Sequence, residues 1–212
     1  MAPVKAQVKK NQETVGRITA AALQAFAEHG FEGARIDEIA KRAAVNKAMI
    51  YYHIGDKQAL YARALHGAFG DIAAQIAATV SRAQTPEKKL KAYIRSLAEI
   101  FQRYPLLPPI MMREFASGGR HLPEIVALDM LRILDTVSDI LRQGCKQKVF
   151  IPTPPLVLHL MVVGTMTYLR TTQPVRQRFA GNSQAKTLAP ASGNDRIPHA
   201  HVEKLVLRAI KR

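Results

Sequence analysis

The sequence predicts an all-α protein, on the basis of three observations. Apolar residues recur every three or four positions through most of the chain, which is the spacing of one face of a helix. No segment shows the alternation of apolar and polar residues that is typical of a β-strand. Glycines and prolines interrupt the pattern where helices of ordinary length would end. We therefore expect a small N-terminal unit of three helices followed by a larger helical bundle.

The first helix is expected over residues 12–29, where apolar side chains such as Ile18 and Phe26 share one face. Gly30 provides a helix stop at its end. Residues 1–11 carry three lysines and hardly any large apolar side chain. This composition indicates a flexible basic arm ahead of the first helix.

Two short helices and one long helix follow. Residues 36–43 fit a helix because two acidic residues in its first turn favour the positive end of the helix dipole. Residues 47–54 fit a second helix, with the side chain of Asn46 as its N-cap. Gly55 breaks the chain before a long helix over residues 57–82.

The middle of the chain continues with two helices of unequal length. Residues 86–103 have the pattern of a long helix. The prolines within residues 105–109 predict an extended break, because each proline disfavours helical backbone in the residue before it. A shorter helix over residues 110–117 then ends at Gly118.

The last third of the chain predicts three more helices and one loop. Residues 123–146 and 155–172 fit long helices that begin with a proline, which the first turn tolerates. Residues 181–198 are rich in Gly, Asn, Ser, Pro and Ala, which predicts a flexible loop. Residues 199–211 close the chain as a helix.

The composition indicates a folded protein with a polyanionic partner. The 212 residues are 48% hydrophobic, which is enough for a core, and the formal net charge of +15 favours nucleic acid or an anionic membrane surface as the partner. A single cysteine, Cys145, excludes an internal disulfide or a thiolate metal cluster. His66, His121 and His159 lack the spacing of metal ligands, so we expect neither a metal nor a cofactor.

No stretch of the sequence approaches the roughly 18 apolar residues that a membrane span needs. The first residues contain no apolar run for export. We therefore expect a cytoplasmic protein without a membrane partner. No helix pattern combines a strongly cationic face with a bulky apolar face, which argues against a protein of the membrane surface.

The helix over residues 47–54 has two chemically different sides. At 100° per residue, Ile50 and Ile54 share one face, which we expect to pack inward. The helix before it joins through a turn of about three residues, which is the helix-turn-helix arrangement. A small residue at the outer face allows close approach to a DNA major groove, and neighbouring polar side chains offer hydrogen bonds to phosphates and base edges. These outward and flanking residues are Lys47, Ala48, Tyr51, Tyr52 and His53.

Two adjacent stretches carry a family signature: ITAAALQAFAEHGFEGA at residues 18–34 and RIDEIAKRAAVNKAMIYYHIGDKQAL at residues 35–60. Together they resemble the DNA-binding region of the TetR family of bacterial transcriptional regulators. The resemblance implies that Lys47, Ala48, Tyr51, Tyr52 and His53 face DNA and that Lys57 contacts a phosphate. It also implies an all-α C-terminal domain that dimerises through its last two long helices and encloses a ligand pocket.

This resemblance divides the chain into a DNA-binding domain over residues 12–56 and an effector-binding and dimerisation domain over residues 57–212. Apolar residues at helical spacing are more often core than ligand contacts, but six residues are candidates for the effector site. They are Tyr93, Phe101, Met111, Met112, Phe115 and His159. The segment MREFASGGRHLPE at residues 112–124 also resembles a stretch of some family members, but it identifies no ligand.

Three positions depart from the family pattern. Ala44 stands where a turn glycine is usual, and a left-handed backbone there would cost on the order of 1 kcal/mol. Ala34 and Arg35 replace two threonines, and Arg35 can supply a stronger phosphate contact than the lost hydroxyl. Ile54 replaces an aromatic residue, which we expect to alter packing more than recognition.

Three functions remain to be compared. The sequence contains no phosphate-binding glycine loop, no G-x-S-x-G and no H-E-x-x-H, so we expect no catalytic residues and no enzyme activity. We expect a homodimeric repressor that a small, largely apolar effector releases from a pseudo-palindromic, double-stranded operator. The alternative is a DNA-binding protein that is blind to effectors and acts architecturally or through a protein partner.

Overall fold

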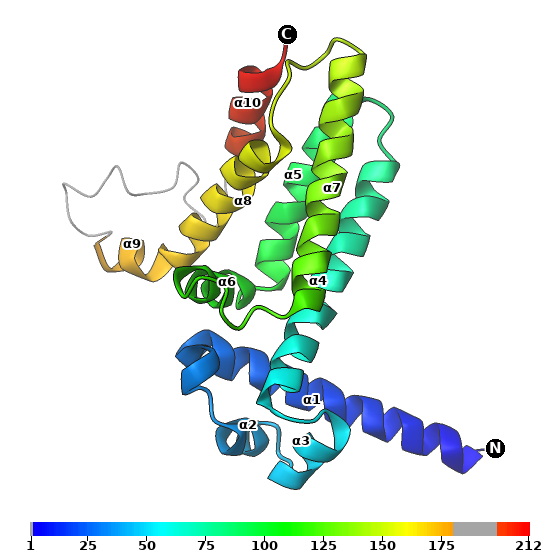
Figure 1. Cartoon of the computed structure of the whole chain (residues 1–212), viewed down its shortest axis with the longest axis vertical. Helices are drawn as coiled ribbons and strands as arrows, with labels where there is room; N and C mark the ends of the chain where they lie inside the picture. The colour runs from blue at the N-terminus through cyan, green and yellow to red at the C-terminus, as the bar shows by residue number, and fades with distance from the viewer. Residues whose placement is uncertain (1, 180–198) are drawn as a thin grey trace. The chain divides into compact units, whose positions relative to one another are not determined.

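The computed structural model describes residues 2–179 and 199–212. These residues form ten α-helices and no β-strand, which confirms the all-α prediction (Figure 1). A single bridge joins Phe150 to Lys211. The loop predicted over residues 181–198 lies outside the described residues. Within the described ranges, each helix is too short or too polar to cross a membrane.

The helices form two compact units. The first unit comprises Met1–Gly70 and Pro109–Leu128, and the second comprises Asp71–Pro108 and Asp129–Arg212. The helices of the first unit are α1 (Ala2–Gly33), α2 (Ile36–Arg42), α3 (Lys47–His53), the first half of α4 (Lys57–Ser81) and most of α6 (Leu107–Ala116). Its fully buried side chains include Ile18, Phe26, Ile39, Ile50 and Leu60.

Helix α1 differs from the prediction at its N-terminal end. The sequence predicts an arm over residues 1–11, whereas the helix begins at Ala2. Alanine, lysine and glutamine favour helix, and the only proline of this stretch lies in the first turn, so the helix extends through it. Lys9 and Lys10 are exposed on this extension. At the other end, the predicted stop at Gly30 breaks the helical backbone with a φ of 70°.

The turn between α2 and α3 has the local structure that the sequence indicates. Ala44 has a φ of 52°, so the left-handed conformation is kept without glycine. The amide of Ala44 donates to the carbonyl of Lys41 at 3.2 Å, and the amide of Val45 donates to Ala40 at 3.0 Å. This pair of bonds is the Schellman motif that closes a helix C-terminus. The Asn46 side chain then caps α3 by accepting from the Met49 amide at 2.8 Å.

The second unit is a helical bundle around α5. Helix α5 (Pro86–Arg103) contacts both α8 (Pro155–Thr171) and α10 (His199–Ile210). The second half of α4, most of α7 (Glu124–Lys146) and α9 (Gln173–Phe179) complete the unit. Its core contains large apolar side chains that are fully or almost fully buried, among them Ile76, Leu90, Ile94, Val137 and Val162.

Helices α6 and α9 differ from the prediction. Helix α6 begins at Leu107 rather than at residue 110, because Pro108 and Pro109 occupy its first turn, where no amide donor is needed. Helix α9 was not predicted. The side chain of Arg176 holds it to the end of α8, donating to the Leu169 carbonyl at 2.7 Å.

Candidate nucleic-acid interface

Helix α3 combines a buried side with an exposed aromatic side. Ile50 is fully buried, and Ile54 is half-buried. On the other side, Tyr52 is 82% exposed and Tyr51 is 49% exposed. Large aromatic side chains seldom lie in water to this extent, so this face has the character of a binding surface.

The other predicted contacts of α2 and α3 also lie at the surface. Arg35 is exposed at the N-cap of α2, where its side chain makes no capping hydrogen bond. Ala48 lies four residues before Tyr52, on the same face of α3, and is also exposed. Lys47 Nζ lies 3.0 Å from Asp37 Oδ1, so a phosphate would have to compete with this carboxylate. His53 lies edge-on to Tyr52, with 4.9 Å between the ring centroids.

Lys57, at the start of α4, makes contacts that the sequence did not predict. Its Nζ donates to the carbonyl of Glu32 at 3.0 Å. The same ammonium lies 4.9 Å from the centroid of the Phe31 ring. Lys57 therefore joins the start of α4 to the end of α1. Two of its three N–H groups remain for a phosphate.

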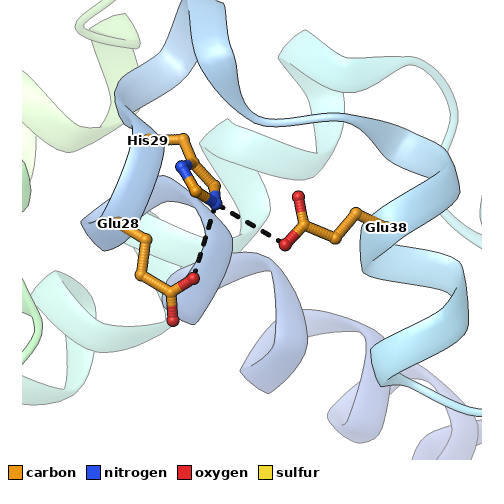
Figure 2. A group of neighbouring side chains, drawn as sticks. All are labelled: Glu28, His29 and Glu38. Atoms are coloured by element: carbon orange, nitrogen blue, oxygen red, sulfur yellow. Dashed lines mark ion pairs between the residues drawn. The ribbon is translucent and has the colours of Figure 1, made fainter.

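A charged cluster joins α1 to α2 (Figure 2). His29 Nε2 lies 3.5 Å from both Glu28 Oε2 and Glu38 Oε1. Arg42 Nη2 donates to Glu28 at 2.5 Å and also to Glu38. The hydrogen bond from Arg42 lowers the pKa of the Glu28 carboxyl below its usual range.

Glu28, His29 and Glu38 lie close enough together to hold a metal ion, since their ligand atoms are within 4.8 Å of one another. However, the guanidinium of Arg42 already supplies the positive charge that a metal would bring. A metal ion would have to displace it from both carboxylates. The cluster is therefore best described as an ion-pair network that holds α2 against α1.

Two of the candidate effector residues meet in the second unit. Tyr93 of α5 is fully buried, and its hydroxyl lies 2.6 Å from Nδ1 of His159 on α8. Burial raises the pKa of the Tyr93 hydroxyl and lowers the pKa of the His159 imidazole. A protonated hydroxyl and a neutral imidazole therefore share this hydrogen bond at neutral pH, and the tautomer of His159 decides which of the two donates.

Comparison with known proteins decides the family. Residues 18–64 match the model described as bacterial regulatory proteins, tetR family. The repressor AcnR of Corynebacterium efficiens is 30% identical over 149 residues, which is 68% of this chain and 73% of AcnR. The chain belongs to the TetR family. The predicted helix-turn-helix family is thereby confirmed.

Two further proteins are similar to this chain, one in sequence and one in fold. The transcriptional regulator RutR of Escherichia coli K12 is 28% identical over 145 residues, which is 68% of either chain. The solved structure of the regulator FadR from Bacillus subtilis, in complex with stearoyl-CoA, superposes with a TM-score of 0.68. It covers 90% of this chain and 96% of FadR, at 18% identity, and therefore supports the fold alone.

The remaining candidate effector residues of this TetR-family chain lie in different environments. Phe101 is half-buried on α5. Met111 is buried on α6, in the first unit. Met112 and Phe115 are 38% and 52% exposed, because α6 turns its other side to the core. Thus Tyr93 and His159 are the pair that the structure brings into direct contact.

Sequence reasoning missed a half-open hollow in the first unit. It has a volume of about 430 Å³ and lies between the end of α1, the start of α4, α6 and the loop after α6. None of the six candidate effector residues lines it. The one available signal was the segment at residues 112–124, which resembles a stretch of other family members and contributes a large part of the lining.

Proposed function

We propose that the chain is a homodimeric transcriptional repressor, which binds a pseudo-palindromic operator and leaves it when a small, largely apolar effector binds. The outward face of α3 carries this proposal. Tyr52 is 82% exposed, while Ile50 on the opposite face is fully buried and fixes the helix in place. A helix held in this way presents the same side chains to DNA each time it docks.

In this proposal the DNA contacts divide into two kinds. Lys47, Ala48, Tyr51, Tyr52 and His53 face the major groove and read base edges, whereas Arg35 and Lys57 hold phosphates. Residues 12–56 form the DNA-binding domain, and residues 57–212 bind the effector and dimerise. The ion pair between Lys47 and Asp37 opens when Lys47 turns to DNA.

A dimer through α8 and α10 places two such domains on one operator. Helix α8 carries an exposed apolar stripe with a spacing of four residues, at Leu156, Leu160 and Tyr168. Gly164 continues this stripe, and a Cβ atom built on it has no atom within 4 Å. Such a face favours close approach of a second helix. Leu205 of α10 is 65% exposed and extends the surface.

Support for an apolar effector comes from the second unit and from one relative. FadR of Bacillus subtilis is named as a complex with stearoyl-CoA, a molecule with a long apolar chain. In this chain the Tyr93 and His159 pair offers one polar anchor, the Nε2 atom of His159, because Nδ1 faces the Tyr93 hydroxyl. We propose that Phe101, which belongs to the same unit, supplies an apolar contact to the effector. Met111, Met112 and Phe115 belong to the first unit and stay candidates from the sequence alone. The protein is a regulator without enzyme activity.

The coupling between effector and operator is the direct test of this function. Small apolar molecules are screened by thermal shift, because a ligand of the folded state raises its melting temperature. Any hit is then titrated into the free protein and into the DNA-bound protein. A repressor requires weaker ligand binding in the DNA complex, since the two ligands affect each other by the same factor. Equal affinities in the two titrations would favour the effector-blind alternative.

A further inference from the structure

The hollow in the first unit has an apolar wall built from aromatic side chains. Phe31 stacks on the imidazole of His121 at 4.3 Å between centroids and lies edge-on to Tyr61 at 5.1 Å. Ile110 of α6 adds an aliphatic surface. At about 430 Å³, the hollow lies within the range of sites that hold small organic molecules.

Both carboxylates that line the hollow are already engaged. Glu114 is buried and accepts two hydrogen bonds, one from the Tyr61 hydroxyl at 3.1 Å and one from the His121 amide at 2.7 Å. Burial raises the pKa of the Tyr61 hydroxyl, which keeps it protonated as a donor. Glu32 pairs with the imidazole of His121 at 2.9 Å. Both carboxylates therefore already have a partner among the side chains and amides that surround the hollow.

The two arginines that line the hollow make few hydrogen bonds to the described residues. Nη2 of Arg113 donates to the carbonyl of Glu28 at 3.1 Å. The other N–H groups of this guanidinium have no partner in the described part of the chain. Arg120 is exposed and makes no hydrogen bond or ion pair with any described residue. Guanidinium groups bind carboxylates through two parallel hydrogen bonds. The guanidinium N–H groups that have no partner among the described residues therefore suit a carboxylate.

We propose that this hollow binds a small organic acid, with its apolar body against Phe31, Tyr61 and Ile110 and its carboxylate on Arg113 and Arg120. None of the six candidate effector residues belongs to the lining of this site. It also gives the segment at residues 112–124 a chemical role, because both arginines and the buried Glu114 come from this segment.

Such a ligand would act on the DNA-binding helices from close range. The hollow is lined by Gly30, Phe31 and Glu32 at the end of α1, and Lys57 contacts the last two of these. Helix α2 begins four residues after Glu32. A ligand in the hollow would therefore change the position of α2 and the contacts of the Lys57 ammonium. This second part of the inference rests on the proposed function.

The test uses 1-naphthoate as the acid and 1-naphthamide as its uncharged counterpart, titrated calorimetrically into the full chain without DNA. We expect naphthoate to bind at least tenfold more tightly than the amide. Arg120→Gln should weaken naphthoate binding at least tenfold, and Arg113→Gln should do the same. Arg82→Gln, which removes an exposed arginine of the second unit, is the matched control and should bind naphthoate as the wild type does.

Arg120 makes no hydrogen bond or ion pair with the described part of the chain, so its variant tests the site even if Arg113→Gln fails to fold. The absence of naphthoate binding to the wild type, equal binding of the two probes, or unchanged binding by Arg120→Gln would overturn the proposed site. A DNA titration forms a separate arm. Naphthoate should change the DNA affinity of the wild type and not that of Arg120→Gln. An unchanged wild-type DNA affinity would overturn the link to DNA, whereas a protein that binds no DNA would overturn the proposed function instead.

Discussion

Replacing Ala44 by glycine should stabilise the protein. Ala44 has a φ of 52°, a left-handed conformation in which its Cβ is strained. The methyl group is exposed, so its removal sacrifices no packing. The two backbone hydrogen bonds of the turn, from Ala44 to Lys41 and from Val45 to Ala40, do not involve the side chain. Glycine therefore keeps every contact of the turn and removes the strain.

The size of the effect follows from two opposing terms. The left-handed conformation costs alanine about 1–2 kcal/mol relative to glycine. Glycine gives the unfolded chain more freedom, which offsets about 0.4–1 kcal/mol of this gain. The midpoints of these two ranges differ by about 0.8 kcal/mol, which is the expected rise in the unfolding free energy of Ala44→Gly. For a chain of this length, the corresponding rise in melting temperature is about 2–3 °C.

The assay is urea unfolding followed by the helical circular dichroism signal. Wild type and variant are compared at one protein concentration, since the stability of a dimer depends on concentration. Ala20→Gly is the matched control, because Ala20 is exposed in the interior of α1 and glycine there should destabilise by about 1 kcal/mol. An Ala44→Gly variant that is no more stable than the wild type would refute the assignment of strain to this turn.

Four other substitutions have definite outcomes. Tyr52→Ala should weaken binding to the preferred operator and leave the helical content intact, whereas Lys57→Ala should weaken binding to all DNA and reduce the salt slope by about one unit. Gly164→Leu should shift the wild-type dimer toward monomer in sedimentation experiments. Because burial lowers the pKa of folded His159, the unfolded chain takes up the proton first, and the unfolding free energy should fall as the pH drops below about 6.5. His159→Gln should remove that part of the fall.

Each of these outcomes can fail in a recognisable way. Unchanged DNA affinity in both the Tyr52 and Lys57 variants would remove the proposed DNA face. A wild type that sediments as a monomer at micromolar concentration would remove the basis of the dimer. For the pH experiment, His201→Gln replaces an exposed histidine and serves as the control. Equal pH profiles for the wild type and the His159 variant would contradict the burial argument.

Local signals in the sequence predicted local structure well. The cap at Asn46 depends on one side chain and an amide three residues away, so the sequence contains the whole interaction. The left-handed backbone at Ala44 was suggested by the family pattern alone, which has a turn glycine at this position. The predicted start of α1 was wrong because the charge of residues 1–11 was given more weight than their helix propensity.

The parts that sequence reasoning missed depend on residues far apart in the chain. The bond between Tyr61 and Glu114 joins positions 53 residues apart, and Lys57 reaches back 25 residues to the carbonyl of Glu32. Periodicity reports which face of a helix is apolar, but it does not report which helices meet. The hollow in the first unit and the second role of Lys57 therefore became visible only in the folded chain.

Selection of DNA from random duplexes tests the central claim most directly. The wild-type protein should enrich a pseudo-palindrome whose half-sites lie about one helical turn apart, roughly 34–36 Å. Tyr52→Ala, which keeps the buried Ile50 and hence the fold of α3, should enrich no such sequence under the same conditions. Enrichment of the same pseudo-palindrome by the variant, or the absence of any enriched sequence with the wild type, would contradict the assignment of α3 as the helix that reads DNA.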